Sequence, residues 1–406
     1  MKKEAFEIVN AAIKAADPYI NTKRLVSELF PKGTATVMSI GKAAVPMAKA
    51  AEDVLGDRIK TGLLVTKYAH SEGYNSPYYE IIESAHPVSD ENSIKAARRG
   101  LEIANSLTVD DTLLVLLSGG GSALFEDSII SPVLQRDITS KLLSRCASIR
   151  EINAVRKRLS LVKGGALAAA AYPAKVITVA LSDVLSNDKS VIASGITFPD
   201  GESQEFLRET VNKYLSDIPE EIKNLIYKKR EFRINDGGYY FAGDINILCD
   251  AAGEKAEEMG FTVHHRERDL SGEAKDEAVR LLRSIPHEKG KHCYIFGGET
   301  VVTLKGKGKG GRNQEMALSA AIELRGKKGI SFISVGSDGT DGPTDDAGGF
   351  SDGTTYDMMC KVSVSPEKEL ADNNSNYALM KVNSLVTTGP TGTNVNDITL
   401  ILTDNY

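Results

Sequence analysis

The chain has 406 residues, 41 % hydrophobic and 26 % charged, which is the mix of an ordinary globular protein. Its 55 acidic residues outnumber 49 basic residues and leave a net charge of -6, which disfavours a nucleic-acid partner because neutralising phosphates requires a positive face. Apolar runs such as 112–117 are far shorter than the roughly 20 residues of a membrane helix. The four cysteines contain no CxxC pair and fit thiols in a reducing compartment. We expect a cytoplasmic protein with no nucleic-acid and no membrane partner.

In the first half, apolar residues at helical spacing predict helices, and short continuous apolar runs predict strands that are covered on both faces. The predicted helices are 3–16, 43–55, 90–106, 132–146, 162–171, 203–214 and 220–229. The predicted strands are 35–40, 62–66, 79–84, 111–117 and 174–181. Residues 183–201 are polar and rich in turn formers, which predicts a long loop.

The second half repeats the alternation. We predict helices over 245–259, 272–284 and 312–324, and strands over 262–264, 292–296, 300–304, 330–335 and 397–402. Alternating strands and helices predict an α/β fold with mainly parallel sheets. At roughly 150 residues per domain, the length predicts about two or three domains. The best boundary lies within 230–243, which divides the chain into 1–235 and 236–406.

Several predicted strands end in a polar, glycine-rich corner, where α/β proteins bind ligands. The strongest corner is Ser118-Gly119-Gly120-Gly121-Ser122, whose glycines leave backbone amides unshielded. It is typical of a phosphate or carboxylate site, the plainer alternative being a tight turn without a ligand.

A second glycine run, 306–311, formally matches GxGxxG but interleaves lysines and has no convincing acidic partner about 20 residues on. A mobile basic loop that clamps polyphosphate fits it better than a nicotinamide site, and a solvated turn is the alternative. Gly41-Lys42 is followed by Ala43, so no Walker A motif is present.

Aspartates crowd two other corners. Asp183 and Asp188 stand in SDVLSND, and Asp338 and Asp341 begin SDGTDGPTDDAGG. Oxygen ligands of this kind suit Mg²⁺ shared with substrate phosphates, whereas local turn chemistry is the alternative. The histidines show no metal-ligand spacing in the sequence, and His86 is interpreted as structural or as supporting the site from behind.

The sequence resembles the type II glycerate kinases, including their C-terminal MOFRL segment, over nearly the whole chain. The resemblance rests on separated motifs in the expected order: IGKA at 40–43, HPVSDENS at 86–93, LLSGGGSAL at 116–124, EINAVRKRLS at 151–160, KGGALA at 163–168, SDVLSNDKSVIASG at 182–195, GGETVVTLKGKGKGGRNQE at 297–315, GSDGTDGPTDDAGG at 336–349 and GPTGTNVND at 389–397. The chain departs from the family pattern at Ser89, Arg158, Asn187 and Ile196.

The resemblance implies ATP-dependent phosphorylation of D-glycerate with Mg²⁺ or another divalent cation, most often giving 2-phosphoglycerate. It also implies two α/β domains, the first flavodoxin- or Rossmann-like, with the active site in the cleft between them, and it leaves a homodimer open. Lys42 and Arg312 match catalytic positions, and Asp183 is the expected base or metal ligand. Further substrate contacts are expected from Ser118, Gly119, Gly120, Gly121, Ser122, Asn153, Lys157, Glu299, Asn394 and Asn396, and further metal contacts from Asp188, Asp338 and Asp341. The competing interpretations are a hydroxypyruvate reductase and a non-catalytic protein that binds nucleotides or sugar acids.

Overall fold

The structure is a computed structural model that describes residues 1–228 and 230–405. Internal packing divides the chain into two compact units, each described by itself. The parallel-sheet unit comprises Pro18–Leu181 and Asn187–Ala242. The mixed-sheet unit comprises Met1–Asp17, Ser182–Ser186 and Gly243–Tyr406.

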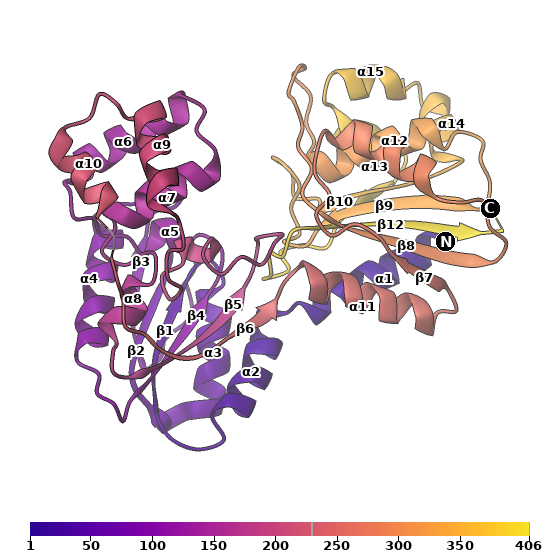
Figure 1. The fold of residues 1–406 in the computed structure, drawn as a ribbon. Coiled ribbons are helices and arrows are strands. Elements are labelled where there is room, and N and C mark those ends of the chain that lie inside the picture. Colours follow the sequence, from indigo (N-terminus) through magenta and orange to yellow (C-terminus); the bar gives the residue numbers. More distant parts are fainter. Residues whose placement is uncertain (229, 406) are drawn as a thin grey trace. The chain divides into compact units, whose positions relative to one another are not determined.

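The parallel-sheet unit contains a six-stranded sheet in the order β3-β2-β1-β4-β5-β6. Its strands are β1 (Ala35–Ile40), β2 (Ile59–Lys67), β3 (Tyr79–Ser84), β4 (Thr112–Leu117), β5 (Lys175–Leu181) and β6 (Asn235–Gly243), and the pairs from β3 to β5 are parallel. α3 (Ala44–Leu55) packs on β1 and β2, and α4 (Glu91–Asn105) packs on β2 and β3 from the other side (Figure 1). The chain winds outward from β1 to β3 and then returns to β4 beside β1. The gap between β1 and β4 is therefore the topological switch point of the sheet.

Short helices complete this unit. They are α2 (Pro18–Leu29), η1 (Gly56–Arg58), α5 (Gly121–Leu124), α8 (Ala166–Ala170) and η2 (Ile192–Ser194). Four more helices form a separate cluster with its own apolar core, as Figure 1 shows: α6 (Pro132–Ser144), α7 (Ile149–Leu159), α9 (Gln204–Tyr214) and α10 (Glu220–Tyr227). The apolar core of this cluster includes Leu142, Val155, Leu207 and Ile226.

The mixed-sheet unit has the strand order β11-β10-β9-β12-β8-β7. Its strands are β7 (Thr262–His265), β8 (Lys291–Gly298), β9 (Ile330–Gly336), β10 (Gly348–Asp352), β11 (Leu385–Val386) and β12 (Asp397–Asp404). α1 (Lys2–Ala15) and α11 (Ile245–Glu258) cover one face, while α12 (Ala274–Ser284) and α13 (Arg312–Glu323) cover the other (Figure 1). α14 (Thr355–Lys361), α15 (Pro366–Ala371) and α16 (Ser375–Met380) pack near α13.

The α/β class is confirmed, and the mainly parallel sheet expected in both halves is found in the first. In the second sheet only the pair β7–β8 is parallel among the pairs between described strands, because β12 inserts antiparallel between β8 and β9. The strand predicted over 300–304 is wrong, since Val301 forms only an isolated bridge to Glu273. The other predicted strands agree with the structure to within three residues at either end.

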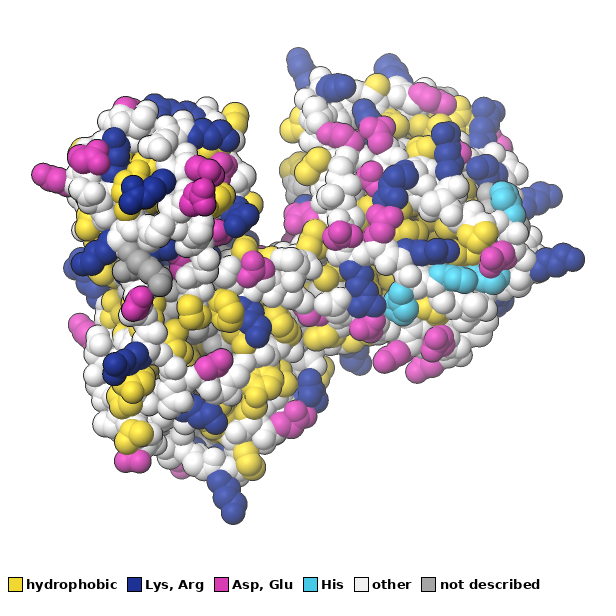
Figure 2. Space-filling view, viewed as in Figure 1, with side chains coloured by type: hydrophobic (Ala, Val, Ile, Leu, Met, Phe, Trp, Pro, Cys, Tyr) yellow, Lys and Arg dark blue, Asp and Glu magenta, His cyan; other side chains and the backbone are white. Residues whose placement is uncertain are grey.

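The packing units differ from the predicted ranges 1–235 and 236–406 in one main respect. Residues Met1–Asp17 belong with the second half of the chain, because α1 packs against α11. The domain division itself stays a prediction. No helix among the described residues is long and apolar enough to cross a membrane. On the face shown in Figure 2, side chains of both charge signs are interspersed.

Candidate functional site

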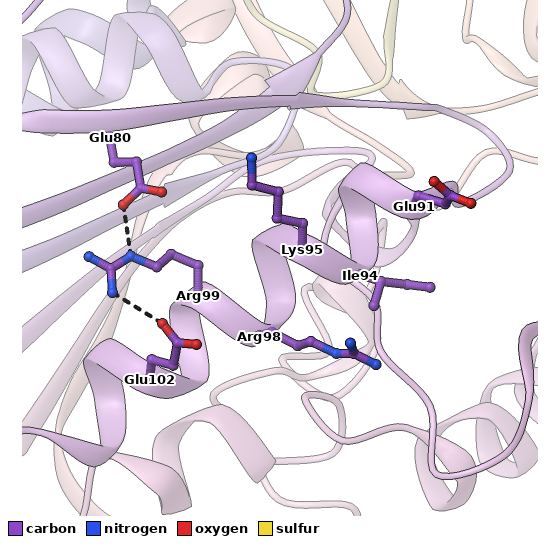
Figure 3. A pocket seen from close by; sticks show the side chains of 7 residues that line it. All are labelled: Glu80, Glu91, Ile94, Lys95, Arg98, Arg99 and Glu102. Atoms are coloured by element: carbon purple, nitrogen blue, oxygen red, sulfur yellow. Dashed lines mark hydrogen bonds and ion pairs between the residues drawn. The ribbon is translucent and has the colours of Figure 1, made fainter.

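A surface pocket of about 520 Å³ lies on α4 and β3, as Figure 3 shows. Three of its charged side chains pair with one another: Arg99 Nε donates to Glu80 at 2.7 Å and Arg99 Nη1 donates to Glu102 at 3.2 Å. Ion pairs of this exposed kind are ordinary surface chemistry. The functional groups therefore have to be sought at the strand ends.

The switch point of the parallel sheet brings together the two corners that follow β1 and β4. The Lys42 amide donates to the Gly119 carbonyl at 2.9 Å, and the Ala43 amide donates to Ser118 Oγ at 3.0 Å. Gly41 permits this approach, because a Cβ on it would lie 2.2 Å from Ser118 Oγ. Ser118 is buried and joins the two corners, so it positions the loop, and its predicted contact with a ligand stays a prediction.

Lys42 and His86 both lie beside Gly120, in the loop 118–122 that we call the glycine loop. Gly120 has φ +87°, and a Cβ on it would lie 3.1 Å from His86 Cδ2 and 3.3 Å from Lys42 Cγ. Within the described residues, the amides of Gly119 and Gly120 have no hydrogen-bond partner. Burial, together with Lys42 and Lys67, lowers the pKa of His86, so its ring is neutral at pH 7. Open amides beside an exposed lysine make a corner that can accept an anion.

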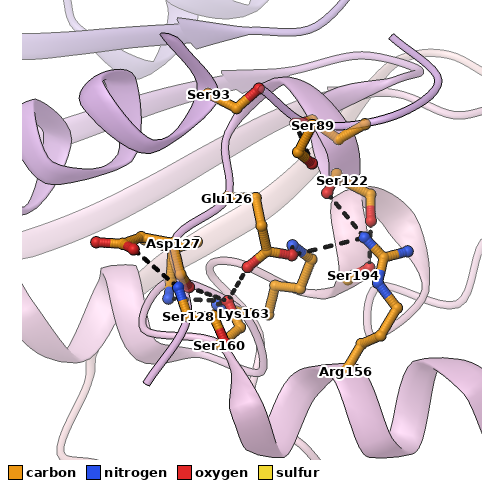
Figure 4. Close-up of polar contacts among 12 residues, drawn as sticks. Ser89, Ser93, Ser122, Glu126, Asp127, Ser128, Arg156, Ser160, Lys163 and Ser194 are labelled. Atoms are coloured by element: carbon orange, nitrogen blue, oxygen red, sulfur yellow. Dashed lines mark hydrogen bonds and ion pairs between the residues drawn. The ribbon is translucent and has the colours of Figure 1, made fainter. Parts of the chain in front are cut away.

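A buried polar network lies beneath this loop, as Figure 4 shows. Lys163 pairs with Glu126, and Ser160 Oγ donates to Glu126 at 2.7 Å. Burial lowers the pKa of Lys163 to about 8, although Glu126 opposes that shift. Arg156 pairs with Glu126 at 3.5 Å and donates to the Ser122 carbonyl at 3.2 Å. The network thus anchors the end of the glycine loop from below.

Asn153 and Lys157 lie on α7 at spacings of three and four residues, which places them on one helix face with Arg156. Arg156 contacts the glycine loop through the Ser122 carbonyl. Both Asn153 and Lys157 are more than nine-tenths buried, and burial lowers the pKa of Lys157. Lys157 packs against Gly164, since a Cβ on Gly164 would lie 3.4 Å from Lys157 Cβ, and contact of Asn153 and Lys157 with the glycine loop stays a prediction.

In the mixed-sheet unit, Arg312 opens α13 and is held by two carboxylates. Asp397 accepts from Arg312 Nε at 2.5 Å and from Nη2 at 2.9 Å, while Glu299 lies 3.1 Å from Nη1. Burial would lower the pKa of Arg312, but the hydrogen bonds to Asp397 and the nearby carboxylates raise it above its ordinary value. Burial raises the pKa of Asp397 while Arg312 opposes that shift. We name Arg312, Asp397 and Glu299 the arginine clamp.

Asn396 connects this clamp to two acidic corners. Its Nδ2 donates to the Asp183 carbonyl at 2.9 Å and to Glu299 at 3.3 Å, and its carbonyl accepts from the Ser337 amide at 3.1 Å. Its Oδ1 is buried without a partner among the described residues, although the residue is only 3 % exposed. The corner that begins at Ser337, the Asp183 backbone and the arginine clamp are therefore held together by one residue.

The four aspartates expected to bind metal have different surroundings. Asp341 is buried, and its two oxygens accept from the amides of Asn313 and Gln314 at the start of α13, at 3.1 and 2.8 Å. Burial raises the pKa of Asp341 to about 7. Asp338 accepts from the Thr340 amide at 3.0 Å, and Asp188 from the Ser190 amide at 2.8 Å. Within the described part of the mixed-sheet unit, Asp183, Asp338 and Asp341 do not gather as one ligand group.

The lysine-rich run at 305–309 is held in place by hydrogen bonds to residues 372–374. The amides of Lys305 and Gly306 donate to Asn373 Oδ1, at 2.7 and 3.0 Å. The next amides donate to Asp372 and Asn374. The glycines of this run allow that close packing, since a Cβ on Gly306 or Gly308 would lie 2.2 or 2.3 Å from residues 372 and 374. These amides are not open to a dinucleotide, while the lysine side chains of the run remain exposed.

One residue of these sites was missed in the sequence. Asp397 ends the GPTGTNVND motif, but nothing local indicates its pairing with Arg312, 85 residues away. His86, which we interpreted as structural or as supporting the site from behind, lies beside Gly120. Asn394 lies in the same segment as Asn396, and no hydrogen bond between its side chain and the described residues is present.

Comparisons with known proteins match nearly the whole chain. A domain of unknown function, DUF4147, matches residues 4–227, and the MOFRL family matches residues 292–397. A "D-glycerate 2-kinase" of Thermotoga maritima is 45 % identical over 98 % of this chain and 97 % of that protein. A crystal structure of a glycerate kinase from Thermotoga maritima superposes with a TM-score of 0.94 at 45 % identity, over 99 % of each chain. A "putative hydroxypyruvate reductase" of Agrobacterium vitis is 36 % identical over 97 % of this chain and 93 % of that protein. The chain therefore belongs to the glycerate kinase family, whose DUF4147 and MOFRL segments it carries in sequence order.

Proposed function

We propose that this chain transfers the γ-phosphoryl group of ATP to the 2-hydroxyl of D-glycerate and releases ADP and 2-phosphoglycerate. The observation that carries the proposal is the switch-point corner, where open amides of Gly119 and Gly120 stand beside exposed Lys42. Phosphoryl transfer needs positioned positive charge and hydrogen-bond donors more than covalent chemistry. The 45 % identity to a protein named for this reaction supports the same conclusion.

In this proposal the glycine loop holds a carboxylate or phosphate oxygen by its amides. The exposed ammonium of Lys42 neutralises charge on the transferring group. The hydroxyl oxygen of glycerate forms the new P–O bond as the bond from the γ-phosphorus to the β–γ bridging oxygen breaks. The hydroxyl proton passes to a carboxylate, for which Asp183 is our candidate. Asn153, Lys157, Asn394 and Asn396 remain proposed contacts to substrate.

Arg312 is the proposed second positive group, and the clamp restricts how it acts. Asp397 occupies the Nε and Nη2 edge of the guanidinium, and Glu299 occupies one side of Nη1. A substrate anion can therefore replace Glu299, whose side chain is 47 % exposed, and leave the buried pair of Arg312 with Asp397 intact. We propose that Glu299 releases part of Arg312 when substrate binds.

Mg²⁺ or another divalent cation is the proposed cofactor. The carboxylates of Asp183 and Asp338 are the oxygen ligands that Mg²⁺ prefers, and one or two of them suffice when phosphates and water complete the coordination. When bound, the ion would neutralise phosphate charge. Asp341 is omitted because its oxygens accept bonds from α13, and Asp188 stays a prediction. The expected cytoplasmic location, the homodimer and a site formed by both domains also stay predictions.

The second candidate function is the reduction of hydroxypyruvate, which the name of one relative favours. It requires a nicotinamide site. The formal GxGxxG run offers no open amides over 305–309, because residues 372–374 accept their hydrogen bonds. The kinase proposal therefore has the stronger structural support.

A coupled ADP-release assay with ATP, Mg²⁺ and D-glycerate tests the proposal, with the product isomer resolved by ³¹P NMR. We expect ADP release that requires both glycerate and the metal, and 2-phosphoglycerate as the product. L-glycerate serves as the matched substrate control, and NADH with hydroxypyruvate tests the alternative. Hydride transfer without ADP release would overturn the kinase proposal, and 3-phosphoglycerate would overturn the assigned hydroxyl.

A further inference from the structure

Two histidines that stand 28 residues apart in the sequence meet at one edge of the mixed sheet. β7 is the edge strand and pairs in parallel with β8, so that Thr262 lies opposite His292 and His264 lies opposite Tyr294. Side chains at i and i+2 of a strand share a face. His264 and His292 are thus diagonal neighbours on one face, and Figure 2 shows histidine side chains on the visible surface in this part of the unit.

Glu288 completes a group of three ligand atoms. His264 Nε2 and His292 Nδ1 are joined by a hydrogen bond of 3.1 Å, and Glu288 Oε2 lies 3.5 Å from the same Nδ1. A bound ion would replace the proton that the two rings share. All three ligand atoms lie within 4.8 Å of one another. Four ligands at about 2.05 Å from a tetrahedral Zn²⁺ are separated from each other by roughly 3.3 Å. The two measured separations fall on either side of that value.

The surrounding contacts orient the rings as a metal site requires. His292 Nε2 lies 2.9 Å from the Lys289 carbonyl, so Nε2 carries the proton and Nδ1 keeps its lone pair toward the cluster. A carbonyl on the far nitrogen is the usual outer partner of a metal-bound histidine. The His264 ring stacks on Tyr294 with centroids 4.5 Å apart and planes 10° apart, which fixes its orientation.

Charge and burial also fit a bound cation. His292 is 8 % exposed, whereas the Glu288 side chain is 42 % exposed and can adjust to an ion. Arg266, which lies over the Tyr294 ring at 5.3 Å, opposes a cation, and Glu288 offsets it.

We propose that His264, Glu288 and His292 bind one divalent transition-metal ion, with Zn²⁺ as the best match and water at the fourth position. Two imidazoles and a carboxylate are borderline ligands that suit Zn²⁺, whereas Mg²⁺ prefers oxygen ligands alone. The ion would join edge strand β7 to β8 and to the turn that contains Glu288. It is a structural site, independent of the proposed kinase chemistry.

Metal titration of the full chain, after treatment with a chelator, tests this proposal. Isothermal titration with Zn²⁺ should show one ion per chain, and Zn²⁺ should raise Tm while equimolar Mg²⁺ does not. Co²⁺ should give the intense visible absorption of tetrahedral coordination. Absence of saturable Zn²⁺ binding would overturn the proposal.

Variants of the proposed ligands test whether Zn²⁺ binds at this cluster. His264→Gln and Glu288→Gln should each weaken Zn²⁺ binding by at least about 10-fold, because loss of a ligand costs no less than loss of an outer partner. His265→Gln changes the neighbouring histidine on the opposite strand face and should bind like the parent. Glu288→Gln alters a half-exposed side chain, so its circular dichroism and its glycerate-dependent turnover, measured with Mg²⁺ but without Zn²⁺, should match the parent. Equal binding by all three variants would overturn the assignment.

Discussion

Replacing Asp397 with asparagine perturbs the arginine clamp at its buried end. The substitution keeps the size of the side chain but removes its charge and turns one acceptor into a donor. Arg312 then loses one of the two hydrogen bonds at 2.5 and 2.9 Å, and the buried edge of its guanidinium faces an amide. Glu299 remains on the exposed edge.

The size of the effect follows from burial. Removing one partner of a buried ion pair lowers the free energy of unfolding by about 3–5 kcal/mol. Because the Arg312 side chain is 34 % exposed, water partly solvates its unpaired charge, and the expected loss for Asp397→Asn is about 2–3 kcal/mol. For a unit of this size, that lowers Tm by roughly 4–12 °C. A guanidinium displaced by about 1 Å costs on the order of 100-fold in turnover.

Three variants separate the contributions in the coupled ADP-release assay and in thermal unfolding. Asp397→Asn should lower both kcat and Tm. Arg312→Lys keeps the charge but loses the paired donors, so kcat should fall by about 100-fold or more with a smaller loss of Tm. Glu299→Gln makes the same chemical change as Asp397→Asn on the exposed side and should lower Tm by no more than about 4 °C.

Near-normal kcat in Asp397→Asn, with a reduced Tm, would show that the pair stabilises the fold without positioning a catalytic group. Near-normal kcat in Arg312→Lys would remove Arg312 from the proposed machinery altogether. An unchanged Tm in Asp397→Asn would refute the magnitude derived from burial.

Three further outcomes are expected. Lys42→Met should lower kcat by about 100-fold or more while Tm stays unchanged, since Lys42 is exposed; normal turnover would exclude its proposed role. Gly120→Ala should cost about 1–2 kcal/mol at its φ of +87° and raise KM, because its Cβ would crowd His86 at 3.1 Å; an unchanged KM would contradict an anion site there. Burial raises the pKa of Asp341 to about 7 from 3.8, so its contribution to stability is present below about pH 4 and is lost as pH rises through 7. Between pH 4 and 8, the free energy of unfolding of the parent should therefore fall by up to about 4 kcal/mol relative to that of Asp341→Asn. A Tm difference between the two proteins that does not change with pH would refute this.

Continuous apolar runs predicted the central strands well, because both faces of such strands are covered. β1 over Ala35–Ile40 coincides with its predicted range, and β4 over Thr112–Leu117 begins one residue later than predicted. Strand direction was not readable, since a covered strand is apolar whether its neighbours are parallel or antiparallel. β10 (Gly348–Asp352) was missed because GGFSD has the composition of a loop, and only pairing with β9 makes it a strand.

Among the proposed functional residues, motifs identified those at strand ends and helix starts, such as Lys42 and Arg312. They did not identify partners from distant segments. Asp397 reaches Arg312 only because β12 lies between β8 and β9. The histidine cluster was excluded by its spacing in the sequence, yet pairing of β7 with β8 brings His264 to His292.

The packing of α1 on α11 has a consequence for biosynthesis. α1 emerges first from the ribosome, but the sheet that it covers is completed only when central strand β12 emerges, about 390 residues later. At roughly 5–20 residues per second, α1 waits about 20–80 s for the complete sheet, although its partner helix α11 emerges earlier. The parallel-sheet unit can fold during that interval. A nascent chain that stalls before β12 would therefore present a finished first unit together with a helix pair that has no complete sheet to cover, which is a natural target for chaperones.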